Sequence, residues 1–470
     1  MLRVRGLFLP VRTLALLLSE VLAMSLAFYL FVTPTDGHLL FNSILPMGRS
    51  AEFSIVLASM TIIAMVAAGL YNYDAFVDYR ATLARIMLVL ALELPVIFIV
   101  SFLYRDFVWA AAPPGSGWYL KAILALFACL LITRAAFLLL GDSGALKRRV
   151  VVIGAGERAS RVKALADRAG GAFIPSAFIA APRDQRRLVE STLTLSESFD
   201  AESLYRFALR CGANEIVVAT DDRRGLPVRS LLGCKARGVA ITEFLSFCER
   251  ESGRVDLDAL QPSWLIFSDG FRMSWVARTV KRLFDVTVSA SMLVLTLPLL
   301  LLTALAIKLE DGGPVIYSQE RIGLFGRPFT LYKFRSMHVD AERHSRPQWA
   351  QKADSRITRV GSVIRKVRID ELPQLINVLK GDMSFIGPRP ERPYFVDQLG
   401  AQIPFYGERH AVKPGITGWA QINYPYGASL QDARNKLSYD LYYVKNHTLL
   451  LDCIVLIQTV RVILFPEGAR

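Results

Sequence analysis

The sequence predicts a membrane protein of mixed architecture: an N-terminal four-helix transmembrane bundle, a parallel α/β module, and a re-entrant membrane hairpin joined to a small, mostly helical α+β domain. Three observations predict this order. Four apolar runs come first, a buried strand with a glycine turn follows them, and a further apolar run interrupted by a proline precedes the C-terminal third. We expect the boundaries at 1–146, 147–250, 251–280 (a linker), 281–311 and 312–470.

The composition of the 470-residue chain agrees with such a mixture. The chain is 53% hydrophobic and has a net charge of +14, so it is too apolar for an ordinary soluble enzyme and too charged for a pure transporter. A basic chain with long apolar runs favours anionic lipid and phosphorylated substrates over nucleic acid as partners. The five scattered cysteines lack CxxC spacing, so we expect neither a disulfide framework nor a zinc site.

The four N-terminal apolar runs lie at about 13–33, 52–71, 84–104 and 118–140. Each approaches the ~20 residues with which a helix crosses a bilayer. Arginine and lysine are concentrated before the first run, between the second and third, and after the fourth, so we expect both ends of this bundle in the cytoplasm. Two glutamates within the runs, Glu20 and Glu93, could mark an ion path, but a position near a helix end or pairing within the bundle is the favoured interpretation.

A Rossmann-like α/β module is expected after the fourth run. The stretch VVVIGAGERA is typical of a buried strand, a glycine turn and a helix start, and it carries G-x-G-x-x-A at Gly154, Gly156 and Ala159. This spacing resembles the Rossmann-type dinucleotide fingerprint. The acidic residue expected at the end of the second strand is not evident. Nucleotide binding and a packing, dimerising or regulatory role therefore both stay open.

The apolar run at about 283–307 is long enough to span a bilayer, but three features favour a hairpin. Pro298 removes a helix hydrogen bond near the centre of the run. Lys281 and Arg282 precede the run and Lys308 follows it, so neither flank is preferred for the outside. A simple crossing would also place the next domain outside the cell. We expect a helix–break–helix element that enters and leaves the same leaflet, with a kinked fifth span as the alternative.

The stretch 365–391, RKVRIDELPQLINVLKGDMSFIGPRPE, combines cations, adjacent carboxylates and a stiff turn. Asp370 suits the N-cap of a helix, and a helix N-terminus with neighbouring arginines favours both an ionised carboxylate and a bound phosphate. Asp370 could act as a nucleophile while Glu371 holds Mg²⁺, which proteins bind through one or two carboxylates plus substrate phosphates. The alternative is a capped helix with surface ion pairs.

Cations that could bind phosphate lie on both sides of this carboxylate pair. Lys333 and Arg335 share one face of a predicted strand, and a loop rich in glycine and proline at 406–427 follows the GPRP turn. This loop could recognise a nucleobase or sugar, or it could simply cover the core. Besides the catalytic pair, the substrate-binding candidates are Lys333, Arg335, Arg365, Arg368, Arg389, Arg409 and Lys413.

The C-terminal part of the chain resembles the bacterial sugar transferase family, the monotopic phosphoglycosyl transferases. The matching stretches are DGGPVIYSQERIG, YKFRSM, RIDELPQLINVLKGDMSFIGPRP, VKPGITGWAQIN and YDLYYVKN, and they cover about 278–470. With four spans and a nucleotide-fold module ahead of that part, the whole chain looks like the large-form polyprenyl-phosphate hexose-1-phosphate transferases of exopolysaccharide or O-antigen assembly, including the exosortase-associated branch.

The resemblance implies transfer of a sugar-1-phosphate from a UDP-sugar to undecaprenyl phosphate, with release of UMP. It also implies an Mg²⁺-dependent covalent intermediate on Asp370 and a metal ligand at Glu371. Lys333, Arg365 and Arg389 match the phosphate-binding cations of the family. The protein would lie in the bacterial inner membrane, with its catalytic domain in the cytoplasm and the lipid of that membrane as a partner. A homodimer through the α/β module is a further expectation, and the sequence does not separate glucose, galactose and N-acetylated hexoses.

One position departs from the family pattern. Many members have Ser-Pro at the membrane break, where this chain has Leu297-Pro298, and Thr296 could substitute for the serine. Two other classes of function stay open. One is a membrane-anchored sensor or scaffold that works through the glycine-turn module, and the other, a distant third, is a transporter.

Overall fold

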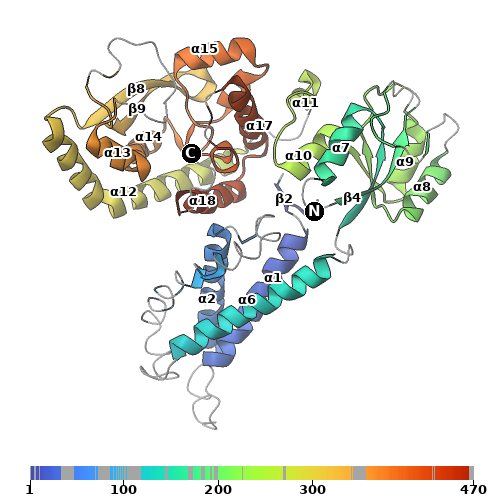
Figure 1. Ribbon diagram of the computed structural model, residues 1–470, viewed down its shortest axis with the longest axis horizontal. Coiled ribbons are helices and arrows are strands. Elements are labelled where there is room, and N and C mark those ends of the chain that lie inside the picture. Colours follow the sequence, from blue (N-terminus) through green and yellow to red (C-terminus); the bar gives the residue numbers. More distant parts are fainter. Residues whose placement is uncertain are drawn as a thin grey trace, which may run out of the picture. The chain divides into compact units, whose positions relative to one another are not determined.

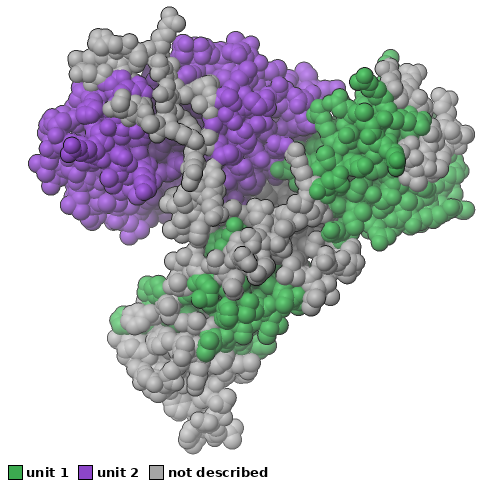
Figure 2. Space-filling view, in the orientation of Figure 1, with its two compact units in different colours: residues 1–4, 8–252 green, residues 5–7, 253–470 purple. Residues whose placement is uncertain are grey.

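The computed structural model of the chain is shown in Figure 1. It describes residues 2–4, 7–9, 11–32, 47–68, 70–71, isolated positions between 85 and 102, and then 118–142, 147–167, 173–181, 186–190, 193–194, 200–224, 226–267, 271, 273–339, 341, 356–425, 427 and 429–464. The chain divides into two compact units, residues 1–4 with 8–252 and residues 5–7 with 253–470 (Figure 2). Two short strands, β1 (Leu2–Val4) and β2 (Leu7–Leu9), stand at the N-terminus.

Three long helices lie over three of the four predicted N-terminal spans. They are α1 (Val11–Val32), α2 (Met47–Ala67) and α6 (Trp118–Asp142). The third predicted span, 84–104, lies largely outside the described residues. Because α1 packs against both α2 and α6, the three helices share one apolar core. The complete four-span bundle stays a prediction.

One of the two acids inside this helical core, Glu20, is paired, whereas Glu93 is buried and neither of its carboxylate oxygens has a hydrogen-bond partner among the described residues. Glu20 and Arg134 are both buried and form an ion pair at 3.1 Å, and Tyr71 donates a hydrogen bond to the same carboxylate. A paired acid agrees better with the packing interpretation than with an ion path. On the outside, Leu22 and Ile132 are 70% and 68% exposed, as expected of side chains that face lipid.

The α/β module contains a five-stranded parallel sheet in the order β5-β4-β3-β6-β7. Its strands are β3 (Arg148–Ile153), β4 (Phe173–Ala180), β5 (Leu193–Thr194), β6 (Glu215–Val218) and β7 (Ala240–Glu243). The order reverses at β3, so the glycine turn after this strand stands at the switch point of a doubly wound sheet. The predicted parallel sheet is confirmed.

Four helices cover the sheet: α7 (Glu157–Asp167), α8 (Ala201–Arg210), α9 (Val228–Ala236) and α10 (Phe244–Ser252). Helix α7 packs with α10 and α8 packs with α9, and the two pairs lie on opposite faces of the sheet (Figure 1). The apolar run from Val150 to Ile153 is wholly buried, because helices cover the central strand on both sides.

A single helix, α12, runs from Trp275 to Asp311 and continues through Pro298. Within the described part of the chain it is the one helix long and apolar enough to cross a membrane. Ser274 caps its N-terminus, and Gly312, with a φ of 69°, ends it. The structure does not divide it into the two helices predicted around Pro298. The proline removes one hydrogen bond, and the leucine-rich turns on both sides still favour helix.

Both ends of α12 contact the same C-terminal domain. Near the start of the helix, Arg282 donates to the carbonyl oxygens of Val378 and Leu379 at 2.6 and 2.7 Å. Near its end, Ile307 packs in a small apolar cluster with Phe334. One domain therefore holds the helix at both ends, while its apolar middle remains exposed.

The C-terminal domain combines two two-stranded sheets with short helices. Strands β8 (Ile316–Ile322) and β9 (Pro328–Phe334) are antiparallel, and β10 (Ser384–Ile386) and β11 (Gly415–Thr417) are parallel. The helical elements of this unit besides α12 are α11 (Pro262–Phe267), η1 (Leu324–Gly326), α13 (Arg359–Lys366), η2 (Ile369–Glu371), α14 (Gln374–Lys380), α15 (Pro393–Gln402), η3 (Tyr406–Ala411), α16 (Trp419–Asn423), α17 (Leu430–Asn446) and α18 (Leu449–Leu464). This mixed content of helix and strand agrees with the predicted α+β domain.

Candidate active site

The two carboxylates of the predicted site lie in η2, a single 3-10 turn. The α-helix expected to begin at Asp370 begins instead at Gln374, so the predicted N-cap is wrong. Pro373 has no N–H to donate to the carbonyl of Ile369 four residues earlier. Leu372 donates to that carbonyl instead, and this i to i−3 bond makes the tighter turn.

Glu371 is buried between two cations. Its Oε1 accepts a hydrogen bond from Arg389 at 2.6 Å and another from Lys333 at 3.3 Å. Burial by itself raises the pKa of Glu371, but Arg389 and Lys333 outweigh it and hold this pKa well below its ordinary value. Burial also lowers the pKa of Lys333, against the opposing charge of Glu371. Glu371 is therefore ionised at neutral pH.

Asp370 is only partly buried, and its carboxylate makes no hydrogen bond or ion pair with any residue that the structure describes. Burial and the adjacent Glu371 raise the pKa of Asp370, although nearby cations oppose the shift. From the sequence we expect the helix N-terminus and the nearby cations to favour the ionised carboxylate, and the cations do act to lower this pKa. The loss of water around the carboxylate and the charge of Glu371 outweigh them. The site thus holds two different carboxylates. That of Glu371 is fixed by two cations, and that of Asp370 is available to a ligand.

Two of the predicted phosphate-binding cations flank this turn. Arg365 lies in the last turn of α13 and opposes the rise in the pKa of Asp370. Arg368 has a left-handed backbone with φ 58° and ψ 22°, which costs a non-glycine residue about 1 kcal/mol or more. Its carbonyl accepts from the amide of Glu371. The strained residue therefore turns the chain from α13 into the carboxylate pair.

The GPRP turn that carries Arg389 follows β10, and two arginines fix it by hydrogen bonds to its backbone carbonyls. Arg409 donates to the carbonyl of Arg389 at 2.9 Å, and Arg321 donates to the carbonyl of Pro390 at 3.0 Å. Arg409 is buried and pairs with Asp440 at 2.8 Å. This position makes Arg409 a support of the turn, in contrast to the substrate contact that the sequence predicted.

Two further predicted substrate-binding residues lie apart from the carboxylate pair. Arg335 is buried just beyond β9 and pairs with Asp311 at the end of α12, so it does not share a phosphate-binding face with Lys333 as expected. Lys413 lies near Arg282, and burial together with that arginine lowers the pKa of Lys413. The predicted cations that lie close enough to act on the carboxylates of Asp370 and Glu371 are Lys333, Arg365, Arg368 and Arg389.

The loop considered for base or sugar recognition is largely used inside the protein. Trp419 stacks on Tyr442, with ring centroids 5.7 Å apart, and donates to the carbonyl of Gly253 at 2.8 Å. Asn423 donates to the carbonyl of Trp419. Burial lowers the pKa of His410 to about 4, so this imidazole is neutral at pH 7. For these side chains the core-covering interpretation is the better one.

A buried cluster of charged residues, which we did not predict from the sequence, connects α12 to β10. Lys281 pairs with Asp285 at 3.1 Å and with Asp452 at 2.8 Å. Asp285 also accepts hydrogen bonds from the hydroxyl of Ser384 and the amide of Phe385. The four-residue spacing of Lys281 and Asp285 is the signal that could have revealed half of the cluster, because it places both on one helix face.

The residues of the carboxylate pair are compatible with the Mg²⁺ ion that the resemblance implies. The described residues contain no group of three or more His, Cys, Asp or Glu side chains that could enclose a metal ion. Glu371 uses one oxygen, Oε1, for both of its cation partners, and Asp370 is adjacent. Mg²⁺ commonly takes one or two protein carboxylates and completes its shell with water and substrate phosphates.

The C-terminal unit matches a known family. The family model described as Bacterial sugar transferase matches residues 276–466, which contain all the site residues discussed above. A UDP-N-acetylgalactosamine-undecaprenyl-phosphate N-acetylgalactosaminephosphotransferase of Aeromonas hydrophila is 45% identical over 263 residues, 56% of this chain and 61% of that protein. A UDP-glucose:undecaprenyl-phosphate glucose-1-phosphate transferase of Caulobacter vibrioides is 42% identical over 191 residues, 40% of this chain and 71% of that protein.

A third relative is matched over nearly its whole length. The protein named as an uncharacterized sugar transferase, EpsL of Bacillus subtilis, is 46% identical over 191 residues, 41% of this chain and 90% of that protein. The chain spans less than two thirds of the Aeromonas hydrophila protein, but more than two thirds of the other two. On this similarity and the match of the family model, the chain belongs to the bacterial sugar transferase family.

Proposed function

We propose that the protein transfers a sugar-1-phosphate from a UDP-sugar to undecaprenyl phosphate, releases UMP, and so begins the assembly of an exopolysaccharide or O-antigen-type glycan. One observation carries this proposal: Glu371 is held by two cations, while the adjacent Asp370 carboxylate has no bond to any described residue. The names of several relatives supply the substrates, because they specify a UDP-sugar and undecaprenyl phosphate.

The proposed reaction has two steps. In the first, a carboxylate oxygen of Asp370 attacks the β-phosphorus of the UDP-sugar. A bond forms between that oxygen and phosphorus, the bond from phosphorus to the bridging oxygen breaks, and UMP leaves with the electron pair. In the second, an oxygen of undecaprenyl phosphate attacks the same phosphorus and the carboxylate of Asp370 leaves. A covalent intermediate lets a soluble and a lipid substrate react in turn at one site.

Lys333, Arg365 and Arg389 supply the positive charge that this reaction needs. A diphosphate and a carboxylate repel each other, and the cations offset that repulsion and stabilise charge on the transferred phosphoryl group. Arg389 is bonded to Glu371 through its side chain and to the buried Arg409 through its carbonyl. It is therefore held in place before the substrate arrives, which reduces the cost of reorganisation.

We also propose Mg²⁺ as the cofactor, with Glu371 as its ligand. When bound, the ion would neutralise charge on the diphosphate of the substrate. Glu371 suits this role because its cation partners keep it ionised at neutral pH. A second carboxylate, Asp370, is next to it in the chain.

The exposed apolar middle of α12 supports a position in the membrane. Val294, Leu295, Leu301 and Leu302 are 63–81% exposed and lie on both sides of Pro298. The same domain holds both ends of the helix. We therefore propose that α12 enters and leaves one leaflet of the bacterial inner membrane, bent at the proline, with the catalytic domain in the cytoplasm and the N-terminal helices crossing the bilayer.

Thr296 is the residue that we expect could substitute for the serine of the family at the break. Its hydroxyl bonds the carbonyl of Met292 at 2.7 Å, whereas the missing N–H of Pro298 leaves the carbonyl of Val294 without its helical partner. Thr303 makes the same kind of bond to a carbonyl four residues back. Such bonds favour bending of a helix, and these two lie on either side of the proline.

The direct test is UMP release by the purified full-length protein in lipid, with Mg²⁺, undecaprenyl phosphate, and UDP-glucose, UDP-galactose or their N-acetylated forms. We expect release with at least one sugar and none from Asp370→Asn. UMP released without undecaprenyl phosphate, limited to one equivalent of enzyme, would support the covalent step. Release that persists in Asp370→Asn would place the nucleophile elsewhere, and no release with any sugar from folded protein would reject the function.

A further inference from the structure

The glycine turn of the α/β module is a motif that the proposed reaction does not use. Gly154 and Gly156 follow β3 and precede α7, where a Rossmann-type module binds the phosphates of a nucleotide. We infer that the phosphate position in this protein is filled by the chain's own Asp221 carboxylate, so that the turn stabilises the module and does not bind a nucleotide.

The carboxylate of Asp221 makes the contacts that a bound phosphate would make. Its Oδ2 accepts from the amide of Glu157 at 2.9 Å, and its Oδ1 accepts from the amide of Arg158 at 3.1 Å. These are the first two residues of α7, and N–H groups at this position have no partner inside the helix. A negative group at a helix N-terminus also interacts favourably with the helix dipole. Asp221 therefore satisfies two of the N–H groups that would otherwise be available to a ligand.

Asp221 also explains why residue 156 is glycine. A Cβ at Gly156 would lie 2.0 Å from Oδ2 of Asp221. Gly156 is not among the described residues with positive φ, so its backbone conformation does not require glycine, and a side chain here would displace the Asp221 carboxylate. Gly154 has a different reason: its φ is 134°, and its Cβ would lie 2.2 Å from the carbonyl oxygen of Ala219. Contacts inside the module thus account for both glycines.

Other groups around the turn are also engaged within the module. Arg158, the cation on the first turn of α7, donates from its guanidinium to the carbonyl of Thr220 at 3.2 Å. On the opposite side of the turn, Leu188 and Val189 donate their amides to the carbonyl of Ala155 at 2.7 and 3.2 Å. To bind here, a nucleotide would have to displace the carboxylate of Asp221 from a turn that these hydrogen bonds stabilise.

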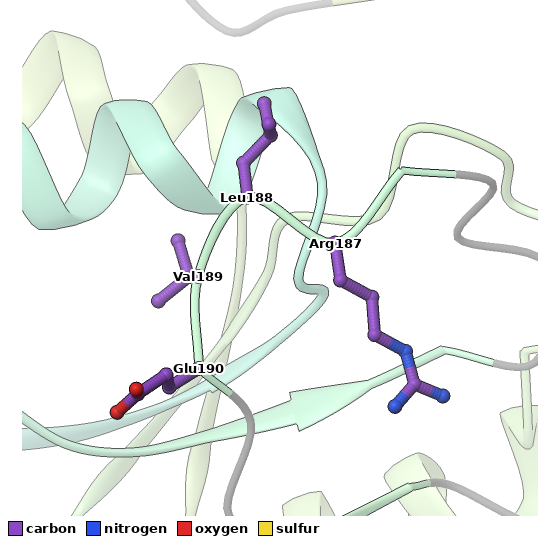
Figure 3. A pocket seen from close by; sticks show the side chains of 4 residues that line it. All are labelled: Arg187, Leu188, Val189 and Glu190. Carbon is purple, nitrogen blue, oxygen red and sulfur yellow. The ribbon is translucent and has the colours of Figure 1, made fainter.

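A hollow of about 540 Å³ opens beside this loop at Arg187–Glu190 (Figure 3). Among the described residues, the side chains that line it are one arginine, one glutamate, one leucine and one valine. The glutamate offsets the arginine, so these four side chains offer no net positive charge to a phosphate.

The first test measures amide hydrogen exchange in the full-length protein, because exchange reports on the module separately from the C-terminal domain. Asp221→Ala and Gly156→Ala should each speed exchange of the Glu157 and Arg158 amides roughly tenfold, since each removes hydrogen bonds to a charged acceptor. The double variant should show no further increase. Effects that multiply to roughly a hundredfold in the double variant would show that Gly156 serves another contact, and would overturn the inference.

The second test adds NAD⁺ at millimolar concentration to the wild-type protein. Exchange of the amides in 154–160 should not change, and slower exchange there would overturn the inference. In Asp221→Ala, inorganic phosphate should slow the amides of Glu157 and Arg158 again, because the anion position is then open. Failure of phosphate to slow them in the folded variant would likewise count against a phosphate position.

Asp222→Ala is the matched control, because this neighbouring carboxylate bonds Arg224. It should leave the exchange of Glu157 and Arg158 unchanged. Unfolding of the module by Asp221→Ala would appear as fast exchange across β3, and Asp221→Asn then takes its place. An asparagine has one acceptor oxygen for two N–H groups, so one of the two amides should still exchange faster. Unchanged protection of both amides in Asp221→Asn would overturn the inference.

Discussion

Asp221 and Asp370 each lie close to a helix start and to a glycine-containing motif, yet the fold gives the two carboxylates opposite roles. Both oxygens of Asp221 are bonded to the first amides of α7, and a glycine leaves room for them. The carboxylate of Asp370 makes no hydrogen bond or ion pair within the described part of the chain, and its pKa is raised. The nearby cations Lys333 and Arg389 bond the carboxylate of Glu371 instead. Such a motif therefore indicates a ligand site only where the fold leaves hydrogen-bonding groups without a partner inside the protein.

Asp370→Asn should show the largest effect and separate the two carboxylates most clearly. Transfer activity should fall by at least about 10³-fold, because the attacking oxygen is removed. Stability at neutral pH should stay equal or rise. Since folding raises the pKa of Asp370, the ionised form at neutral pH favours the unfolded chain. Thermal unfolding should therefore show the wild type losing stability relative to the variant as pH rises from acid to neutral.

A lower unfolding temperature for Asp370→Asn at neutral pH would contradict this picture, because it would mean that the carboxylate stabilises the fold. Retained activity would contradict it from the other side. Either result would make Asp370 resemble Asp221.

Glu371→Gln should lower kcat by about 10²-fold, since Lys333 and Arg389 lose their shared negative partner and the proposed metal ligand is weakened. The charge of Glu371 is, after burial, a cause of the raised pKa of Asp370. Without that charge the pKa of Asp370 should fall, and the acid limb of the pH profile of kcat/KM should move to lower pH. Glu391→Gln, in the neighbouring turn, is the control and should leave this limb in place. A limb that does not move would show that the two carboxylates are not coupled.

Arg409→Lys should lower kcat about tenfold and leave the KM for the UDP-sugar within about twofold. A lysine cannot keep the bonds that Arg409 makes to Tyr406, Asp440 and the carbonyl of Arg389, so the cation of the GPRP turn should lose its position. Steady-state kinetics separate this role from substrate binding. A rise in KM at constant kcat would favour the substrate contact expected from the sequence.

Asp221→Ala should have the smallest effect on catalysis, with UMP release within about twofold of the wild type. The same change should destabilise the α/β module by about 1 kcal/mol, the usual cost of losing a carboxylate at a helix N-terminus. Hydrogen exchange of β3 measures the stability, and UMP release measures the activity. A large loss of activity in a folded module would show that Asp221 affects the reaction and would weaken the contrast with Asp370.

Features of this protein that depend on local pattern can be predicted from the sequence alone. The apolar run of β3 and its glycine turn predict the doubly wound sheet, because residues close in the chain decide a strand and its turn. The length and apolarity of the run at 283–307 predict a helix that can enter a membrane. The family resemblance also depends on contiguous stretches of sequence, and the family model matches residues 276–466.

Which charged groups contact one another depends on the tertiary structure and cannot be predicted from local pattern. Lys333 reaches Glu371 across 38 positions, and Asp221 reaches Glu157 across 64. Contacts between distant residues raise or lower the pKa of Asp370. They also place Asp221 at the glycine turn and pair the buried Arg335 and Arg409 with carboxylates. A local pattern supplies the residue types but neither their burial nor their distant partners. Burial and partners decide whether a carboxylate stabilises the fold or stays available for a reaction.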